Sequence, residues 1–444
     1  MFLSPDEARQ ITDRLLSTSK ADSCVVTIEG RNTTNLRFAR NSGTTNGSHD
    51  RLTVSIRSDF GGRSSTASTT EIDPDTLAQA QQRSEAMARL APVNPEFMSP
   101  LGPQLYANGS GYDEPSASKR AINLAVAART VIQQAVERKI DTAGYAETGP
   151  GFSVIATSAG LFAFHRSTQT RLAVTARNSA GTWSGWAGSL QKRFDQLDAA
   201  TIAARAIQKA DFSTTPLDLE PGKYTVILEP SAVADLVSLL LWNLDARSAD
   251  EGRSFLSKKG GGNKLGEKLF HEAVTITSDP DDPVVSEPVY GIDGLPQKRI
   301  SWVENGVIRN LTCPRFWAQK KGREPMPPPQ TFVMRGGSTS IDDMIKDTKR
   351  GILVTRLWYI REVDPQTLLL TGLTRDGNFL IEDGRVQGPA GNFRFNESPV
   401  AMLSNIAAIG PSEQAHGGEV DGVAFAAPPL LVKDFTFSSK ARGI

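Results

Sequence analysis

The chain has 444 residues, and its 49 lysines and arginines balance its 49 aspartates and glutamates. A balanced charge gives the whole surface no field that attracts nucleic acid or an anionic membrane, so neither is an expected partner, although a local charged patch is left open. The N-terminus lacks the basic start and apolar core of a secretion signal, and no stretch of 18 apolar residues occurs. We therefore expect a cytoplasmic protein. Two cysteines, Cys24 and Cys313, are too few for a disulfide framework or a cysteine-rich metal site.

The first 90 residues alternate between helical and strand-like patterns. Ser4 precedes Pro5 and an acidic first turn, which predicts a helix that continues to about residue 17. Residues 73–90 have the period of a second helix. Between these helices lie short, alternating, β-branched runs that predict strands, namely "CVVTIEG", "TNLRFAR" and "RLTVSIRS".

In the next segment, the sequence predicts a helix, then a run of strands, then a second helix. Residues 116–139 have helical periodicity, and so do residues 196–210. Between them, residues 142–189 form short runs separated by Gly, Ser or Thr, which predicts an antiparallel meander. A polar, proline-containing stretch near residue 215 then predicts a domain boundary.

The second half begins with a predicted strand, residues 224–229, and a helix with one apolar face. The chain then becomes mostly strand and turn. These patterns predict an α+β fold with an N-terminal domain of helices and antiparallel sheet, residues 1–215, and a β-rich C-terminal domain, residues 216–444. The apolar face of the helix consists of Val233, Leu236, Val237, Leu240, Leu241 and Leu244.

The pair His271–Glu272 opens the HE-x-x-H signature of zinc peptidases, which needs a second histidine about one turn later. The required positions hold Thr275 and Ile276. The surrounding β-branched alternation predicts a strand, in which neighbouring side chains point to opposite faces, so we interpret the pair as structural. Of the other histidines, His416 is expected in an exposed loop and His165 in a strand.

The glycine-rich stretch "SKKGGGNKLGE", residues 257–267, lacks the spacing of a phosphate-binding loop, because Lys264 is followed by Leu265. It predicts a flexible loop that could act as a lid over a groove.

The order of several segments between about residues 220 and 410 resembles the TldD/PmbA family, once described as modulators of DNA gyrase and now understood as peptidases that work in pairs. In the first half, "VIATSAGLFAFHRSTQ" is similar to a hairpin of that family. The segments of the second half that carry the resemblance are "SFLSKKGGGNKLGEKLFHEAVTITSDP", "YGIDGLPQKRISWVENGVIRNL", "GGSTSIDDMIKDTKRGILVTRLW" and "FLIEDGRVQGPAGNFRFNESPVAMLSNIAAIG".

In catalytic members, the resemblance implies, an HE-x-x-x-H motif on the helix after the first strand of the second half supplies two zinc ligands, and a cysteine near the C-terminus supplies a third. Here residues 166–270 contain no histidine, and the last cysteine is Cys313. The resemblance is therefore to the PmbA/TldE-like members that lack the zinc motif. We expect no metal or other cofactor in this chain, and zinc in a partner subunit.

The polar run at the end of that helix is the candidate site, because it lies where catalytic relatives carry their machinery. Carboxylates beside an arginine can bind a peptide terminus or a metal. The alternative, which we favour, is a helix end with solvated ion pairs, each worth roughly 0–1 kcal/mol. The residues are Asn243, Asp245, Arg247, Asp250 and Glu251.

Three functions follow from these patterns. The first is a zinc-lacking, TldE/PmbA-like subunit that pairs with a TldD-like, zinc-bearing partner as a heterodimer and helps enclose unfolded or small peptides. The second is a divergent hydrolase that is active alone through the residues from Asn243 to Glu251. The third is a homodimeric or larger homo-oligomeric peptide-binding protein.

Overall fold

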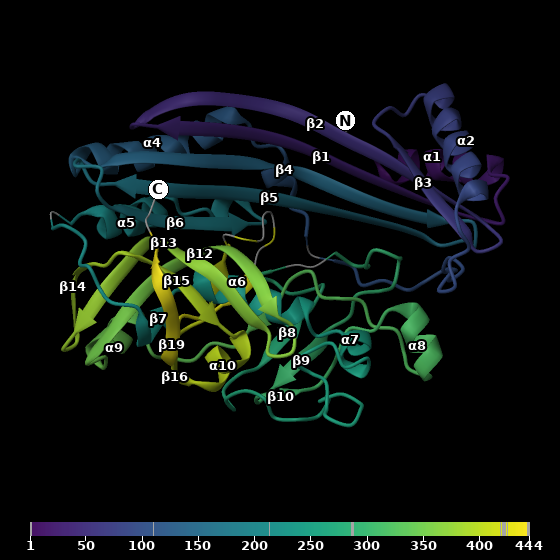
Figure 1. Ribbon diagram of the computed structural model, residues 1–444. Helices are drawn as coiled ribbons and strands as arrows, with labels where there is room; N and C mark the ends of the chain where they lie inside the picture. Colours follow the sequence, from purple (N-terminus) through teal and green to yellow (C-terminus); the bar gives the residue numbers. More distant parts are fainter. Residues whose placement is uncertain are drawn as a thin grey trace.

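The computed structural model describes residues 2–109, 111–212, 214–285, 288–417, 419, 423 and 425–441. Three β-sheets and the helices packed on them form an α+β fold, which confirms the predicted fold class. The first half builds one long sheet, and the second half builds a closed barrel with a smaller sheet beside it (Figure 1).

The long sheet is antiparallel, as predicted for its meander, with strand order β3-β2-β1-β4-β5-β6. Its strands are much longer than the short runs that the sequence predicts, because glycines lie inside them and do not always form turns. A Cβ atom on Gly149 would lie 1.9 Å from the Asn32 oxygen, so this glycine allows close approach of a neighbouring strand. The strands are β1 Ser23–Ala39, β2 Ser42–Phe60, β3 Arg63–Thr69, β4 Asp141–Thr157, β5 Phe162–Arg177 and β6 Ser184–Gln191.

The helices of the first half agree with the predictions except at one place, where the helix expected over residues 116–139 is divided in two. Arg120 has an extended backbone, and its N–H donates to Asn123 Oδ1 at 3.0 Å, which caps the start of the second piece. The helices are α1 Pro5–Thr18, α2 Pro74–Leu90, α3 Glu114–Ala117, α4 Ala121–Glu137 and α5 Ala199–Ala210, with a short 3₁₀ turn at Phe194–Gln196.

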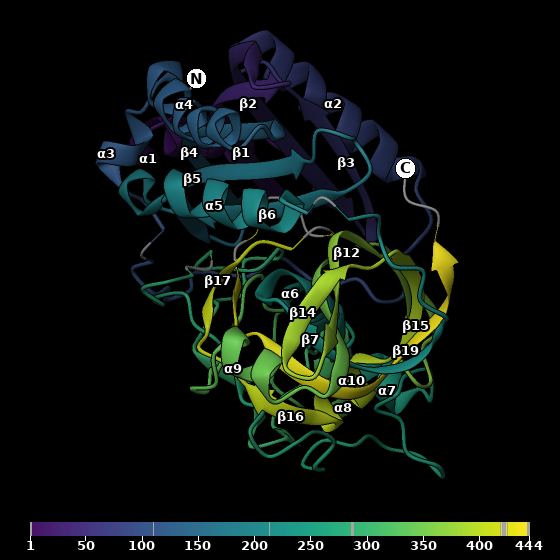
Figure 2. The ribbon, with the colours of Figure 1, turned by 90° about the vertical axis from the view of Figure 1, so that its left-hand side faces the viewer.

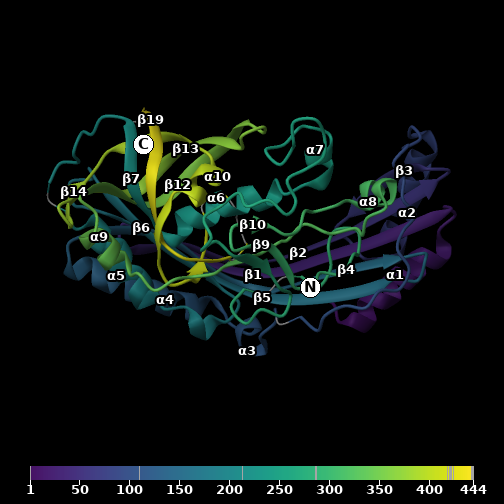
Figure 3. The same cartoon turned by 90° about the horizontal axis from the view of Figure 1, so that it is seen from below.

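The two faces of the long sheet differ in character. Even-numbered residues of β1, β4 and β5 face α1, α2, α4 and α5 and form two apolar clusters with them. Seen from below, α1, α4 and α5 lie along one side of the sheet, and the second half of the chain lies on the other (Figure 3). Odd-numbered residues therefore point to the face opposite these four helices, and some of them, such as Val25 and Ile155, pack against Val289 and Tyr290 of the second half.

Five strands of the second half close into a barrel, because β12 pairs with β7 on one side and with β13 on the other (Figure 2). The strands β14 and β16 extend this sheet. The strands are β7 Gly222–Leu228, β12 Arg350–Asp364, β13 Leu369–Glu382, β14 Arg385–Pro389, β15 Asn392–Glu397, β16 Ile406–Ile409 and β19 Leu430–Ala441.

A third sheet of short strands and four short helices completes the second half. The strands are β8 Ile276–Ser278, β9 Ile300–Glu304, β10 Val307–Ile308, β11 Val333–Met334, β17 Glu413–Ala415 and β18 Phe425–Ala427. The short helices are α7 Ala246–Asp250, α8 Arg315–Lys321, α9 Ile341–Lys346 and α10 Pro399–Ser404. The longer helix α6, Pro230–Trp242, follows β7 and belongs to the large apolar cluster of this half.

Charged and polar side chains join the first half of the chain to the barrel. Lys209 on α5 contacts Glu229, just after β7, at 2.6 Å. Arg356 on β12 contacts Asp376 on β13 at 2.8 Å, and Ser184 on β6 donates to the same carboxylate at 2.8 Å. These groups are largely buried, so the contact between the two halves is polar as well as apolar.

The described strands of the long sheet come from residues 23–191, and those of the other two sheets come from residues 222–441. The predicted boundary between residues 215 and 216 lies in the connecting segment and stays a prediction. Among the described residues, no helix is both long and apolar enough to cross a membrane.

Candidate functional site

The helix α6 is buried on nearly every side, not only on the predicted apolar face. The six residues of the predicted apolar face are buried, although Leu244 lies just beyond the end of the helix. Ala232, Ala234, Asp235 and Ser238 are buried as well. The only polar side chains buried on α6 are Asp235 and Ser238, and Asp235 Oδ1 accepts the Glu419 N–H at 3.0 Å. A catalytic zinc site takes three protein ligands, most often histidines, thiolates and carboxylates. One carboxylate and one hydroxyl on this helix do not match that donor set.

The pair His271–Glu272 lies in a turn before β8, not in the strand that we predicted. The Ala273 N–H donates to His271 Nδ1 at 3.2 Å, which holds the turn. Glu272 lies 3.5 Å from Lys268, in an exposed ion pair one helical turn apart in sequence. The alternation of β-branched residues begins only at Thr275, so the strand starts after the pair. The pair is structural, as interpreted, but because it holds a turn and not because it lies in a strand.

The expectation that His416 lies in an exposed loop is wrong, since its side chain is buried. The reason is the glycine that follows, because a Cβ on Gly417 would lie 2.3 Å from Asp235 Oδ1. The segment after β17 is therefore packed tightly against α6. His165 lies in β5, as predicted, and burial lowers its pKa to about 4.

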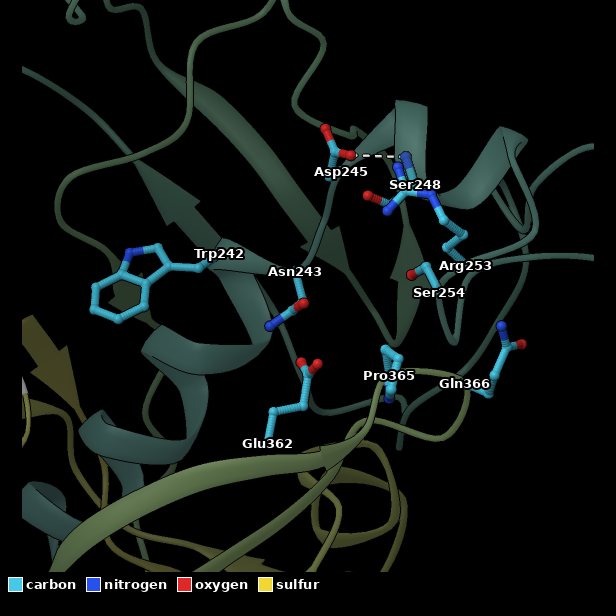
Figure 4. A pocket seen from close by; sticks show the side chains of 9 residues that line it. All are labelled: Trp242, Asn243, Asp245, Ser248, Arg253, Ser254, Glu362, Pro365 and Gln366. Carbon is cyan, nitrogen blue, oxygen red and sulfur yellow. Dashed lines mark hydrogen bonds between the residues drawn. The ribbon is translucent and has the colours of Figure 1, made fainter.

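A pocket of about 600 Å³ opens where α6 ends (Figure 4). Asn243 caps the C-terminus of α6, and its Nδ2 donates to the Leu239 oxygen at 3.0 Å. Asp245 caps the N-terminus of α7 by accepting the Ser248 N–H at 2.7 Å. Figure 4 shows the Asn243 and Glu362 side chains pointing toward one another from opposite walls. The remaining lining residues are Trp242, Arg253, Ser254, Pro365 and Gln366.

Arg247 and Glu251 belong to an ion-pair network and do not line this pocket. The Arg247 guanidinium binds Glu96 through two hydrogen bonds of 2.7 and 2.6 Å, and its Nε donates to Glu251 at 3.2 Å. The hydrogen bonds that Arg247 donates to Glu96, and then the one it donates to Glu251, raise the pKa of Arg247. Arg253 also binds Glu251, at 2.6 Å. The network therefore ties α7 to the loop after α2.

Asp250 serves as a structural anchor. Its side chain accepts hydrogen bonds from Trp317 at 2.9 Å, Asn263 at 2.7 Å and Arg323 at 2.9 Å. Burial alone would raise the pKa of Asp250, but these three donors lower it below its usual value. Three of the five predicted site residues thus hold local structure, and the structure brings together only Asn243 and Asp245 at the pocket.

The loop of residues 257–267 is closed on itself. Ser257 and Asn263 form an isolated β-bridge, and Lys258 lies 2.8 Å from Glu267. Because Asn263 also binds Asp250, this segment is fastened to α7. The lid hypothesis therefore has no support in these contacts.

Sequence reasoning missed the other wall of the pocket. Glu362, Pro365 and Gln366 come from the end of β12 and the following turn, more than a hundred residues after Asn243. The sequence offered one signal for a pocket here, the large aromatic residue Trp242 at the end of a leucine-rich helix. The Trp242 side chain is 48% exposed and lines the pocket. Within the part of the chain that the structure describes, no group of three or more His, Cys, Asp and Glu side chains could hold a metal ion.

Comparison with known families gives two matches. The family description "PmbA/TldA metallopeptidase C-terminal domain" matches residues 221–439, and "PmbA/TldA metallopeptidase central domain" matches residues 112–211. Together these matches cover most of the chain. The protein belongs to the TldD/PmbA family.

Solved structures of low sequence identity share the fold. TldE from Thermococcus kodakarensis is 19% identical, with a TM-score of 0.84 over 96% of this chain and 100% of that one. A protein from Thermotoga maritima, described as a candidate modulator of a DNA gyrase, is 18% identical, with a TM-score of 0.81 over 97% and 100% of the two chains. Among curated proteins, a Methanothermobacter thermautotrophicus protein named "Metalloprotease" is 25% identical over 209 residues. That alignment spans 43% of each chain.

Proposed function

We propose that this chain is the zinc-lacking, TldE-like subunit of a peptidase pair, in which a TldD-like partner holds zinc and performs the cleavage. The observation that carries the proposal is the composition of α6. Although this chain belongs to the family, its helix after β7 has no histidine and buries an almost wholly apolar surface. The helix therefore builds the core of the C-terminal half and has no donor set for a catalytic metal.

In this proposal, the chain contributes a peptide-binding surface at the edge of β12 to the substrate site of the pair. Residues 351–354 of β12 pair with β7, whereas the described pairing of residues 356–364 is with β13 alone. The Tyr359 N–H on this stretch donates to the Glu419 carboxylate. Trp358 and Tyr359 are exposed beside the unpaired edge, and the pocket lies where β12 ends. An extended peptide added at such an edge forms main-chain hydrogen bonds and places alternate side chains in pockets.

The first test is purification of the tagged chain from its native cells, followed by metal analysis. We expect co-purification of a family member that carries HE-x-x-x-H, with stoichiometric zinc in the complex and none in the chain alone. Peptide cleavage should require both chains. Stoichiometric zinc in the isolated chain would contradict the proposal.

A second candidate function is hydrolysis by this chain alone, favoured by the presence of Asn243, Asp245 and Glu362 in one pocket. Asp245→Asn tests it, because asparagine keeps the cap of α7 while removing the carboxylate. If the pocket is catalytic, the variant should lose an activity that the isolated wild-type chain shows. We expect no such activity in either protein, with Asp347→Asn as the control at another helix end.

The third function, a homo-oligomer, predicts a native mass that is a multiple of the mass of this chain, without a peptidase partner.

A further inference from the structure

Four arginines lie on the face of the long sheet opposite α1, α2, α4 and α5, on three of its strands. Arg51 lies on β2, Arg31 and Arg37 on β1, and Arg171 on β5. All four are odd-numbered, and the register places Arg31 opposite Arg51. The strand between β1 and β5 is β4, which contributes the Tyr145 and Glu147 side chains to the same face. We call these six residues the arginine platform.

Contacts within the platform hold its central part in place. The Arg37 and Arg171 guanidinium groups lie 5.4 and 5.9 Å from the centre of the Tyr145 ring. The Tyr145 hydroxyl donates to Glu147 Oε2 at 2.8 Å, and Arg31 lies 3.6 Å from the same carboxylate. Arg31 also donates to Gln169 on β5. The aromatic ring and the single carboxylate thus position three guanidinium groups.

The positive charge on β1 and β2 is only partly neutralised. Glu147 lies beside Arg31. Arg31 and Arg51 are directly opposite on neighbouring strands, an arrangement of like charges that destabilises a sheet. Within the described residues, Arg37 contacts the Tyr145 ring and no carboxylate. Arg37 and Arg51 are exposed, and the Arg31 side chain is 40% exposed. An anion bound here would relieve the repulsion and meet donors that are already oriented.

We propose that the arginine platform binds acidic polypeptide segments through their carboxylates. A guanidinium presents paired donors that match a carboxylate, and those of Arg31, Arg37 and Arg51 on two neighbouring strands can engage successive acidic side chains of an extended segment. The choice of a polypeptide rests on the proposed function, whereas the choice of an anion rests on the platform alone. Nucleic acid is disfavoured, because the chain as a whole has no net charge to attract a long polyanion.

The test is fluorescence anisotropy with the full chain and a labelled short peptide of alternating glutamate and threonine. A peptide in which glutamine replaces glutamate, and a single-stranded oligonucleotide of similar length, serve as competing probes. We expect saturable binding of the acidic peptide that weakens with added salt, and binding of the glutamine peptide at least about tenfold weaker. The double variant Arg37→Gln/Arg51→Gln should weaken binding of the acidic peptide by about tenfold or more.

The control is Arg129→Gln, which removes an exposed arginine from α4, on the other side of the sheet. It should leave the affinity unchanged. Equal affinity for the acidic and glutamine peptides, equal losses in the platform and control variants, or tighter binding of the oligonucleotide would each overturn the proposal. Because binding is measured without a partner, failure to capture a zinc-bearing subunit would sink the proposed function and leave this site standing.

Discussion

Replacing Asp376 with asparagine is expected to lower the free energy of unfolding by about 3 kcal/mol, because it leaves the largely buried Arg356 without its carboxylate. The Asp376 side chain is 10% exposed and lies 2.8 Å from Arg356 and 3.5 Å from Arg375. Burial lowers the pKa of Arg356, and the charge of Asp376 opposes that effect. The same carboxylate accepts the Ser184 hydroxyl of β6, so the variant also weakens the contact between the long sheet and the barrel.

The measurement is the denaturant midpoint, followed by both circular dichroism and tryptophan fluorescence. Asp383→Asn is the matched control, since Asp383 is exposed and has a left-handed φ of 47°, close to the 51° of Asp376. Asparagine is well tolerated in that conformation, so backbone strain is the same in both variants. Adding Arg356→Met to Asp376→Asn should restore much of the lost stability, because an apolar side chain needs no partner. A loss in Asp383→Asn as large as that in Asp376→Asn would refute the explanation.

The wild-type chain is expected to lose stability as the pH falls from 6.5 to about 4, and His165→Gln should remove a large part of that loss. Burial lowers the pKa of His165 from 6.5 to about 4. Between these values the unfolded chain binds a proton that the folded chain does not, so acid favours unfolding. The contribution of His165 is fully present above pH 6.5 and falls by about 3 kcal/mol at pH 4. The region around it is packed, because a Cβ on Gly109 would lie 2.8 Å from Val289 and 3.6 Å from His165.

Unfolding midpoints measured from pH 7 to pH 4 test this expectation. His49→Gln is the control, because His49 is exposed on β2 and its removal changes no buried site. The wild type and the control should show the same steep decline, and His165→Gln a shallower one. Parallel curves for all three proteins would show that His165 does not titrate as its burial requires.

Local patterns determined the helices of this protein well and the strands less well. Ser4 with Pro5 places the start of α1 within a residue, because caps and first-turn proline act over a few residues of chain. The lengths of β1 and β4 could not be predicted in this way. Whether a glycine such as Gly149 ends a strand or lies inside one depends on how closely a neighbouring strand approaches.

The sequence by itself determined the family resemblance and the absence of histidine from α6, since both depend only on the order of residues. The tertiary structure alone decided which polar residues share a site. It separated Asp250 and Arg247 from Asn243, placed Glu362 across a pocket from Asn243, and buried His416 against α6. It also brought Arg171 of β5 onto one face with Arg31, Arg37 and Arg51 of β1 and β2. These groupings join residues far apart in the chain, and such long-range contacts leave no periodic signal in a single sequence.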